Sequence, residues 1–109
     1  MLESMALSDV LEEKKAQEVR WGKQNHEPPI WLMILGEEVG EANKAVLESS
    51  GNGAIQCNGF IKYRDEMVQV AAVALSAVES FDRVRKIKAD AFMQAYQSNI
   101  EAQKSERER

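Results

Sequence analysis

The hydrophobic and polar positions of this chain follow a helical period. Apolar residues recur three or four positions apart over most of the sequence, and no run alternates β-branched with polar residues as a half-buried strand does. Two breaks interrupt the pattern: the adjacent prolines at 28 and 29, and a glycine-rich stretch between residues 51 and 59. The pattern predicts an all-α helical bundle divided at these two breaks.

The expected helices cover residues 9–23, 29–49 and 60–81, and the tail over 82–101 is either a fourth helix or a continuation of the third. Ser8 is the expected N-cap of the first helix. Pro29 is the expected start of the second, because proline suits the first helical turn. The first helix carries only a thin apolar stripe, so it should lie on the outside of the bundle. That stripe is Leu7, Val10, Leu11 and Val19.

A length of 109 residues suits a single domain. Its core is expected over about 8–82, followed by a helical extension over about 83–101 and a frayed, charged end over 102–109. Because so small a domain buries little surface, self-association is an expected way to bury more.

Three glutamates lie close together in the second expected helix. A rotation of about 100° per residue groups its apolar residues on one face. That face consists of Trp31, Leu35, Val39, Ala42 and Val46. Glu38 falls within the face, Glu41 lies at its edge one turn further on, and Glu37 points towards the polar side.

A carboxylate in such a position needs a partner. Left unpaired among apolar groups, it costs several kcal/mol or takes up a proton. A metal ion removes that cost, and carboxylates at i and i+3 can share one hard cation. The third expected helix offers Glu66 and Gln69, again at i and i+3. The alternative for each glutamate is an exposed surface position, which is preferred for Asp65.

These residues resemble a known family. "EEVGE" at 37–41 followed by "EMVQ" at 66–69 resembles the EExxE, spacer, ExxD signature of MazG-like all-α nucleoside triphosphate pyrophosphohydrolases. The segments "WGKQNHEPPIWLMILGEEVGEANKAVLE" and "YRDEMVQVAAVALSAVES" resemble short single-domain members, including those of phages and mobile gene cassettes. The resemblance covers about residues 18–82. It implies an all-α pyrophosphatase bundle that is completed by oligomerisation, as a homodimer or homotetramer.

The resemblance also implies an activity and a metal site. The activity is hydrolysis of (deoxy)nucleoside triphosphates to the monophosphate and pyrophosphate, which cleanses the nucleotide pool. The implied ligands of Mg²⁺ or Mn²⁺ are Glu38, Glu41, Glu66 and Gln69. Gln69 departs from the family's aspartate, and its amide oxygen can bind a hard cation without supplying charge. Glu37 or Glu41 would accept the proton of the attacking water.

Independently of the resemblance, the loop "RWGKQNHEPPIW" is predicted to form a pocket for a base and a sugar. It combines aromatic stacking faces with amide and imidazole edges, and nearby lysines can meet a phosphate. The candidate contacts are Trp21, Lys23, Gln24, Asn25, His26, Trp31 and Lys44. The alternatives are core packing for the tryptophans and a loop-capping role for His26.

Composition narrows the functional classes. A net charge of −4 argues against a nucleic-acid-binding face. The longest weakly polar run, residues 67–78, is too short to span a membrane, and the start lacks the pattern of a signal peptide. One cysteine allows no intrachain disulfide and fits a reducing cytoplasm.

Two other readings compete with the enzyme. The chain can be a helical interaction module, antitoxin-like or regulatory, that kept the fold and lost the chemistry through Gln69. A coiled-coil assembly protein is disfavoured, because the third helix is apolar over too broad a face for a heptad seam.

Overall fold

A computed structural model of the chain describes residues 1–50 and 58–108 and contains three helices in that part. They are α1 (Leu2–Trp21), α2 (Pro28–Ser50) and α3 (Asn58–Arg107). The described residues form no strand, so the all-α prediction is confirmed. Most of the predicted glycine-rich break, 51–57, lies outside the described residues.

The first helix begins earlier than predicted. It starts at Leu2 rather than Asp9, so Ser8 lies inside the helix and is not its N-cap. The residues before position 9 include no proline or glycine, and nothing there opposes helix formation. The helix ends at Trp21, because Gly22 adopts a φ of 74° and its N–H donates to the Glu18 carbonyl at 2.7 Å.

The third helix and the tail form one continuous helix of 50 residues. No glycine or proline occurs from residue 60 onwards, so no local signal ends it at 82. The charged end, predicted to be frayed, is helical to Arg107. At about 1.5 Å per residue the helix is about 75 Å long, and it sets the 84 Å longest dimension of the chain.

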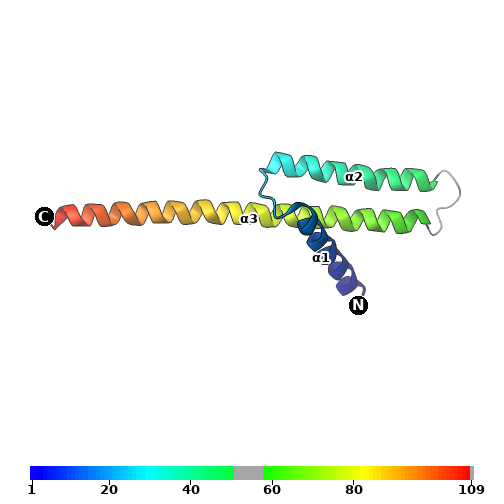
Figure 1. Cartoon of the computed structure of the whole chain (residues 1–109), viewed down its shortest axis with the longest axis horizontal. Helices are drawn as coiled ribbons and strands as arrows, with labels where there is room; N and C mark the ends of the chain where they lie inside the picture. The colour runs from blue at the N-terminus through cyan, green and yellow to red at the C-terminus, as the bar shows by residue number, and fades with distance from the viewer. Residues whose placement is uncertain (51–57, 109) are drawn as a thin grey trace.

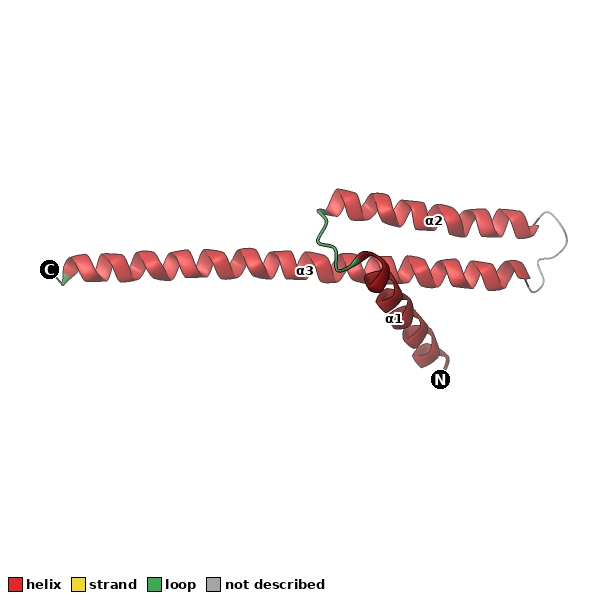
Figure 2. Ribbon diagram, in the orientation of Figure 1, coloured by secondary structure: helices red, strands yellow, loops and turns green. Residues whose placement is uncertain are grey.

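The helices pack as an antiparallel hairpin crossed by a third element. α2 lies beside the first half of α3, and α1 crosses α3 at an angle near its middle (Figures 1 and 2). The second half of α3 projects away from both other helices (Figure 1). The buried apolar residues lie mainly along the seam between α2 and α3. They are Trp31, Ala42, Ala45, Ala72 and Val73.

The face that α2 packs inwards differs slightly from the predicted one. Val39 and Val46 are 40% and 42% exposed, so their predicted inward position is wrong. Small side chains allow close helix approach, and the seam holds Ala45 beside Ala42, which was predicted correctly. The buried and half-buried positions of α2 are Trp31, Ile34, Leu35, Glu38, Ala42 and Ala45. Glu38 therefore lies in the middle of the packed face.

The packed face of α1 is polar. Gln17 is buried and Glu13, Lys14 and Glu18 are half-buried, whereas three of the four predicted stripe residues are exposed. Those exposed residues are Leu7, Leu11 and Val19. No helix of the described part is long and apolar enough to cross a membrane.

Candidate carboxylate site

Glu38 lies at the centre of a group of carboxylates. Burial in the α2–α3 seam is the main cause that raises the pKa of Glu38 above the ordinary glutamate value. The negative charges of four neighbouring carboxylates raise it further. In order of decreasing effect they belong to Glu66, Glu41, Glu13 and Glu37. All three helices therefore place negative charge around one partly desolvated side chain.

Among the described residues, no cation balances the four glutamates that the sequence singled out. Glu66 is half-buried and Glu37 and Glu41 are exposed, and no hydrogen bond or ion pair of the described part involves these three or Glu38. The described part also contains no three His, Cys, Asp or Glu side chains that converge closely enough to hold a metal ion. The carboxylates share one electrostatic neighbourhood without forming a finished coordination shell.

Glu13 of α1 belongs to this neighbourhood, and sequence reasoning missed it. Its carboxylate accepts hydrogen bonds from Gln17 Nε2 at 3.4 Å and from the Arg20 guanidinium at 3.2 Å. The sequence feature that could have identified Glu13 is its i, i+4 spacing from Gln17 on the polar side of α1. The sequence does not show that α1 packs through this polar side, so the feature was not used.

Gln69 lies in a cleft of about 450 Å³ between α1 and α3. One cation, Arg64, lines this cleft, and it pairs with Asp9 at 2.8 Å. The lining residues are Asp9, Glu12, Glu13, Ala16, Arg64, Asp65, Val68 and Gln69. Glu13 both lines the cleft and raises the pKa of Glu38. It therefore connects Gln69 with the carboxylates of the seam.

Four of the predicted substrate contacts border one small cavity, where the end of α1 and the following loop meet α2 and α3. They are Trp21, Lys23, Gln24 and Trp31. Ile34 also lines the cavity, one turn before Glu38 on the same face of α2. The volume is about 40 Å³, room for water rather than for a ligand of the usual 300–1,000 Å³ pocket class.

The two tryptophans differ in setting. Trp31 is 8% exposed, and its Nε1 has no hydrogen-bond partner among the residues that the structure describes. Its ring meets the His26 ring edge to face, with 5.2 Å between the ring centres. Core packing therefore describes Trp31. Trp21 is 56% exposed, and the Arg20 guanidinium lies 4.7 Å from the centre of its ring. Trp21 is thus the tryptophan with a ring accessible for stacking.

The other predicted contacts, Asn25, His26 and Lys44, do not line this cavity. His26 lines an apolar groove between the start of α2 and the middle of α3. Lys44 is 64% exposed and its Nζ lies 4.0 Å from Glu48. The structure does not bring Lys44 together with the other candidate residues.

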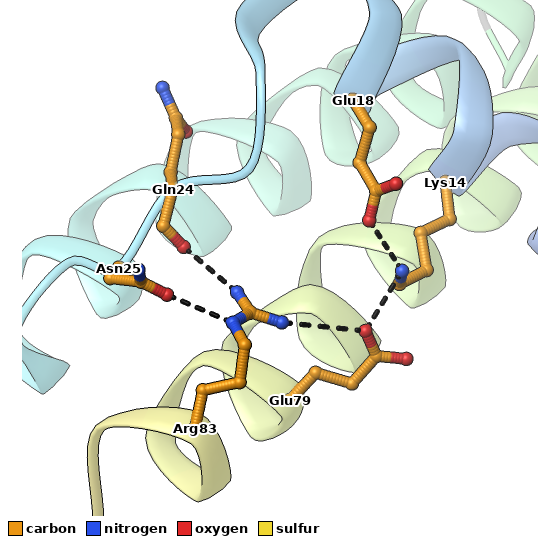
Figure 3. Close-up of polar contacts among 6 residues, drawn as sticks. All are labelled: Lys14, Glu18, Gln24, Asn25, Glu79 and Arg83. Atoms are coloured by element: carbon orange, nitrogen blue, oxygen red, sulfur yellow. Dashed lines mark hydrogen bonds and ion pairs between the residues drawn. The ribbon is translucent and has the colours of Figure 1, made fainter. Parts of the chain in front are cut away.

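A chain of ion pairs holds α1 and the loop against α3 (Figure 3). Lys14 Nζ lies 2.6 Å from Glu18 and 2.9 Å from Glu79. The hydrogen bonds to these two carboxylates raise the pKa of Lys14, and the bond from Lys14 lowers the pKa of Glu18. Arg83 extends the chain, with Nη1 3.8 Å from Glu79.

Arg83 also fixes the loop before α2. Its Nε donates to Asn25 Oδ1 at 3.0 Å and its Nη2 donates to the Gln24 carbonyl at 3.3 Å. Asn25, a candidate substrate contact, thus has its side-chain oxygen engaged within the protein. The side chain of Gln24 points away from Arg83 (Figure 3), so its amide remains available.

Comparison of the chain with protein-family models, curated proteins and solved structures found no match. The resemblance to MazG-like enzymes therefore rests on sequence motifs alone.

Proposed function

We propose that this chain is a Mg²⁺-dependent nucleoside triphosphate pyrophosphohydrolase of the MazG-like type, acting on the cytoplasmic nucleotide pool. One observation carries the proposal. Glu38 is partly desolvated in the packed face of α2, its pKa is raised, and four carboxylates surround it with no pairing cation on Glu38 in the described part. This arrangement costs free energy in the metal-free protein, and a hard cation bound by oxygen ligands removes the cost.

The proposed roles follow from position and exposure. Glu38, Glu41 and Glu66 would hold the metal, and Gln69 would reach it from the α1 side as a neutral ligand. Bound Mg²⁺ supplies neutralisation of the phosphate charge and a lower pKa for the attacking water. Glu37 and Glu41 are exposed, so either carboxylate can take the water proton while the α–β phosphoanhydride bond breaks and pyrophosphate leaves.

The nucleoside is proposed to bind at the loop end of the hairpin. Trp21 offers an exposed ring, and Lys23 and Gln24 lie beside it at the rim of the small cavity. Trp31, seven residues or about 10 Å before Glu38 on α2, forms the buried floor. With this spacing, the base is proposed to lie near Trp21 and the phosphates near the carboxylates. The cavity must widen to admit a base.

The test is a panel of nucleoside triphosphates with detection of pyrophosphate, with and without Mg²⁺. The expected result is metal-dependent release of pyrophosphate that Glu38→Gln lowers at least about 100-fold, because even residues that only orient metal ligands cost 10–100-fold. Glu48→Gln is the matched control on the same helix, since Glu48 pairs with lysines outside the site. Equal activity of wild type and Glu38→Gln would contradict the proposed site.

A second candidate is a regulatory or interaction module of the same fold without the chemistry. Two observations favour it: Gln69 replaces the family's aspartate, and half of α3 projects without a neighbouring helix (Figure 1). Wild-type protein that releases no pyrophosphate from any nucleotide in Mg²⁺ would select this candidate.

A further inference from the structure

An apolar groove lies at the end of the hairpin where α3 continues beyond the start of α2 (Figure 1). The loop before α2, the first turn of α2 and the middle of α3 form its walls. Its volume is about 490 Å³, which falls within the range of about 300–1,000 Å³ that is usual for ligand pockets. The groove is therefore large enough for a small molecule, unlike the cavity beside Trp21.

The walls of the groove expose large apolar side chains. Leu32 is 67% exposed, Val78 is 60% exposed and Phe81 is 50% exposed. Trp31 is the buried part of the same lining, at 8% exposure. A ligand that covers these side chains gains free energy by removing apolar area from water.

Two cations of α3 line the groove without a partner. Arg85 and Lys88 form no ion pair in the part of the chain that the structure describes. The Arg85 guanidinium lies 5.9 Å from the centre of the Phe81 ring, directly beside the apolar wall. Lys86, which lies between them in the sequence, pairs with Asp90 and does not line the groove.

The start of α2 adds positive potential but no donor for an anion. Its first turn contains no acidic residue, so the helix dipole leaves partial positive charge at this end. Its first two residues are prolines, which lack an N–H. The N–H groups of Ile30 and Trp31 both donate to the Glu27 carbonyl, at 3.0 and 3.3 Å. Side chains must therefore hold an anion in this groove, and Arg85 and Lys88 are the cations available.

The charges of the lining suit a ligand with one negative charge. Glu27 is the single acidic residue of the described lining, so the two cations leave one net positive charge when His26 is neutral. A nucleoside triphosphate carries several negative charges, and its metal ions need more oxygen ligands than one carboxylate provides. A carboxylate carries one charge, and its two oxygens match the planar fork of an arginine.

We propose that this groove binds a small amphipathic carboxylate. The apolar body of the ligand lies against Leu32, Val78 and Phe81, and its carboxylate lies between Arg85 and Lys88. The residues of α2 that line the groove end at Leu32, six residues or about 9 Å before Glu38. The binding site is thus separate from the candidate metal ligands, and the proposal stands whether or not those residues hydrolyse nucleotides.

Trp31 provides a fluorescence signal for binding, and octanoate is the probe. Trp21→Phe removes the other tryptophan of the chain, so the emission then comes from Trp31. Octanoate should produce a saturable change in this emission. Octanol has the same chain length without the charge, and it should bind at least about tenfold more weakly. Equal affinities for octanoate and octanol would show that the cations do not select the ligand, and would overturn the proposal.

Two neighbouring positions on α2 test the apolar wall. Leu32→Glu introduces a negative charge into the groove. Met33→Glu is the matched control, because Met33 is also 67% exposed but does not line the groove. Leu32→Glu should weaken octanoate binding at least about tenfold, whereas Met33→Glu should leave the affinity within about twofold. Equal effects of the two substitutions would contradict the proposed location.

The cations of α3 are tested in the same way. Replacing Arg85 and Lys88 together by glutamine should weaken octanoate binding at least about tenfold while leaving octanol binding within about twofold. Lys86→Gln is the control on the same helix, and it should leave both affinities within about twofold. A double variant that binds octanoate as tightly as wild type would overturn the assignment of the carboxylate position.

Light scattering distinguishes a small ligand from a protein chain in the groove. Leu32→Glu and Met33→Glu should both have the same mass as wild type, because a small ligand leaves the assembly unchanged. The proposal would be overturned by a mass that changes in Leu32→Glu alone, which would assign the groove to a protein chain. The absence of a saturable octanoate signal in wild type would overturn it as well.

Discussion

At the scale of single residues, Glu38 is the side chain whose ionisation depends most clearly on the packing of all three helices. Its place in the α2 sequence puts it between Leu35 and Ala42 on the packed face, and the fold then adds carboxylates from α1 and α3. Each added charge raises the free energy of the ionised form. Removing the Glu38 charge should therefore stabilise the metal-free protein, whereas the proposed metal-bound form would need that charge.

Glu38→Gln should stabilise the metal-free protein at pH 7. A raised pKa means that the folded state favours the protonated carboxyl. That contribution is fully present below the ordinary glutamate pKa and is lost as the pH rises through the raised value. Because like charges one turn apart cost a few tenths of a kcal/mol each, we expect a gain of about 0.5–1 kcal/mol.

Urea unfolding of Glu38→Gln and wild type from pH 4 to pH 8 measures this effect. The difference between the two proteins should be near zero at pH 4 and grow with pH. Excess Mg²⁺ should reverse its sign at pH 7, since a ligand that binds only the folded state stabilises it. A variant less stable than wild type in chelator at pH 7 would show that the Glu38 carboxylate is compensated.

Gln69→Asp should tighten metal binding while lowering the stability of the metal-free protein. The change adds a carboxylate to a cleft that already contains Glu13 and three other acids on its walls. Calorimetric titration with Mg²⁺ in the presence of a non-hydrolysable nucleotide should show an affinity higher by about tenfold, or 1.4 kcal/mol. Unchanged affinity would show that residue 69 does not reach the metal.

At the scale of elements, α1 depends on polar contacts for its place. Its large apolar residues are mostly exposed, and Lys14 links it to α3 through Glu79. The Lys14 side chain is 12% exposed, so its two ion pairs, with Glu18 and Glu79, are better shielded from solvent than the other ion pairs of the described part. Arg83 then connects the same network to the loop that carries Gln24.

Lys14→Met should lower the free energy of unfolding by about 1 kcal/mol at pH 7, the upper end for partly exposed pairs. The ion pair of Lys14 with Glu18 stabilises the folded protein at pH values above the lowered pKa of Glu18 and below the raised pKa of Lys14. It should fade as the pH falls through the Glu18 value. Lys86→Met is the control. Lys86 forms a similar pair with Asp90 at 2.8 Å on α3, but its side chain is 77% exposed. Chemical denaturation at equal protein concentration should show a loss for Lys14→Met alone.

At the scale of the whole molecule, the second half of α3 projects beyond the other two helices (Figure 1). A helix segment without tertiary contacts is marginal in water, because most helical stability comes from packing an apolar face. The exposed Phe92, Met93 and Tyr96 on that helix have no covering element within the described residues. We propose that another chain buries them.

The midpoint of thermal unfolding should therefore rise with protein concentration. Association stabilises the folded state by mass action, so a tenfold dilution should lower the midpoint by a few degrees. Circular dichroism at about 2 μM and about 200 μM protein provides the measurement. Unfolding curves that coincide at the two protein concentrations would indicate that the single chain is the folded unit, contrary to this prediction.

The sequence by itself determined the helices and the unusual place of Glu38. Periodicity within one helix fixes the angle between any two of its residues, which is why the inward position of Glu38 was predicted correctly from α2 alone. The adjacent prolines at 28 and 29 marked the break before α2, whereas Gly22, which follows the end of α1, lay within the predicted first helix. The absence of glycine and proline after residue 60 allowed a continuous α3 but did not demand one, because a turn of another kind can end a helix.

Only the tertiary structure decided which helix faces meet. Val39 and Val46 were predicted to face the core together with Ala42, yet Ala42 and Ala45 are the buried residues, because close approach of two helices favours small side chains at the seam. Glu13 joined the carboxylates because α1 crosses α3 with its polar side inwards, and no pattern within α1 shows that crossing. Such contacts join residues far apart in the sequence, so their energies depend on the packing of whole elements and not on local period.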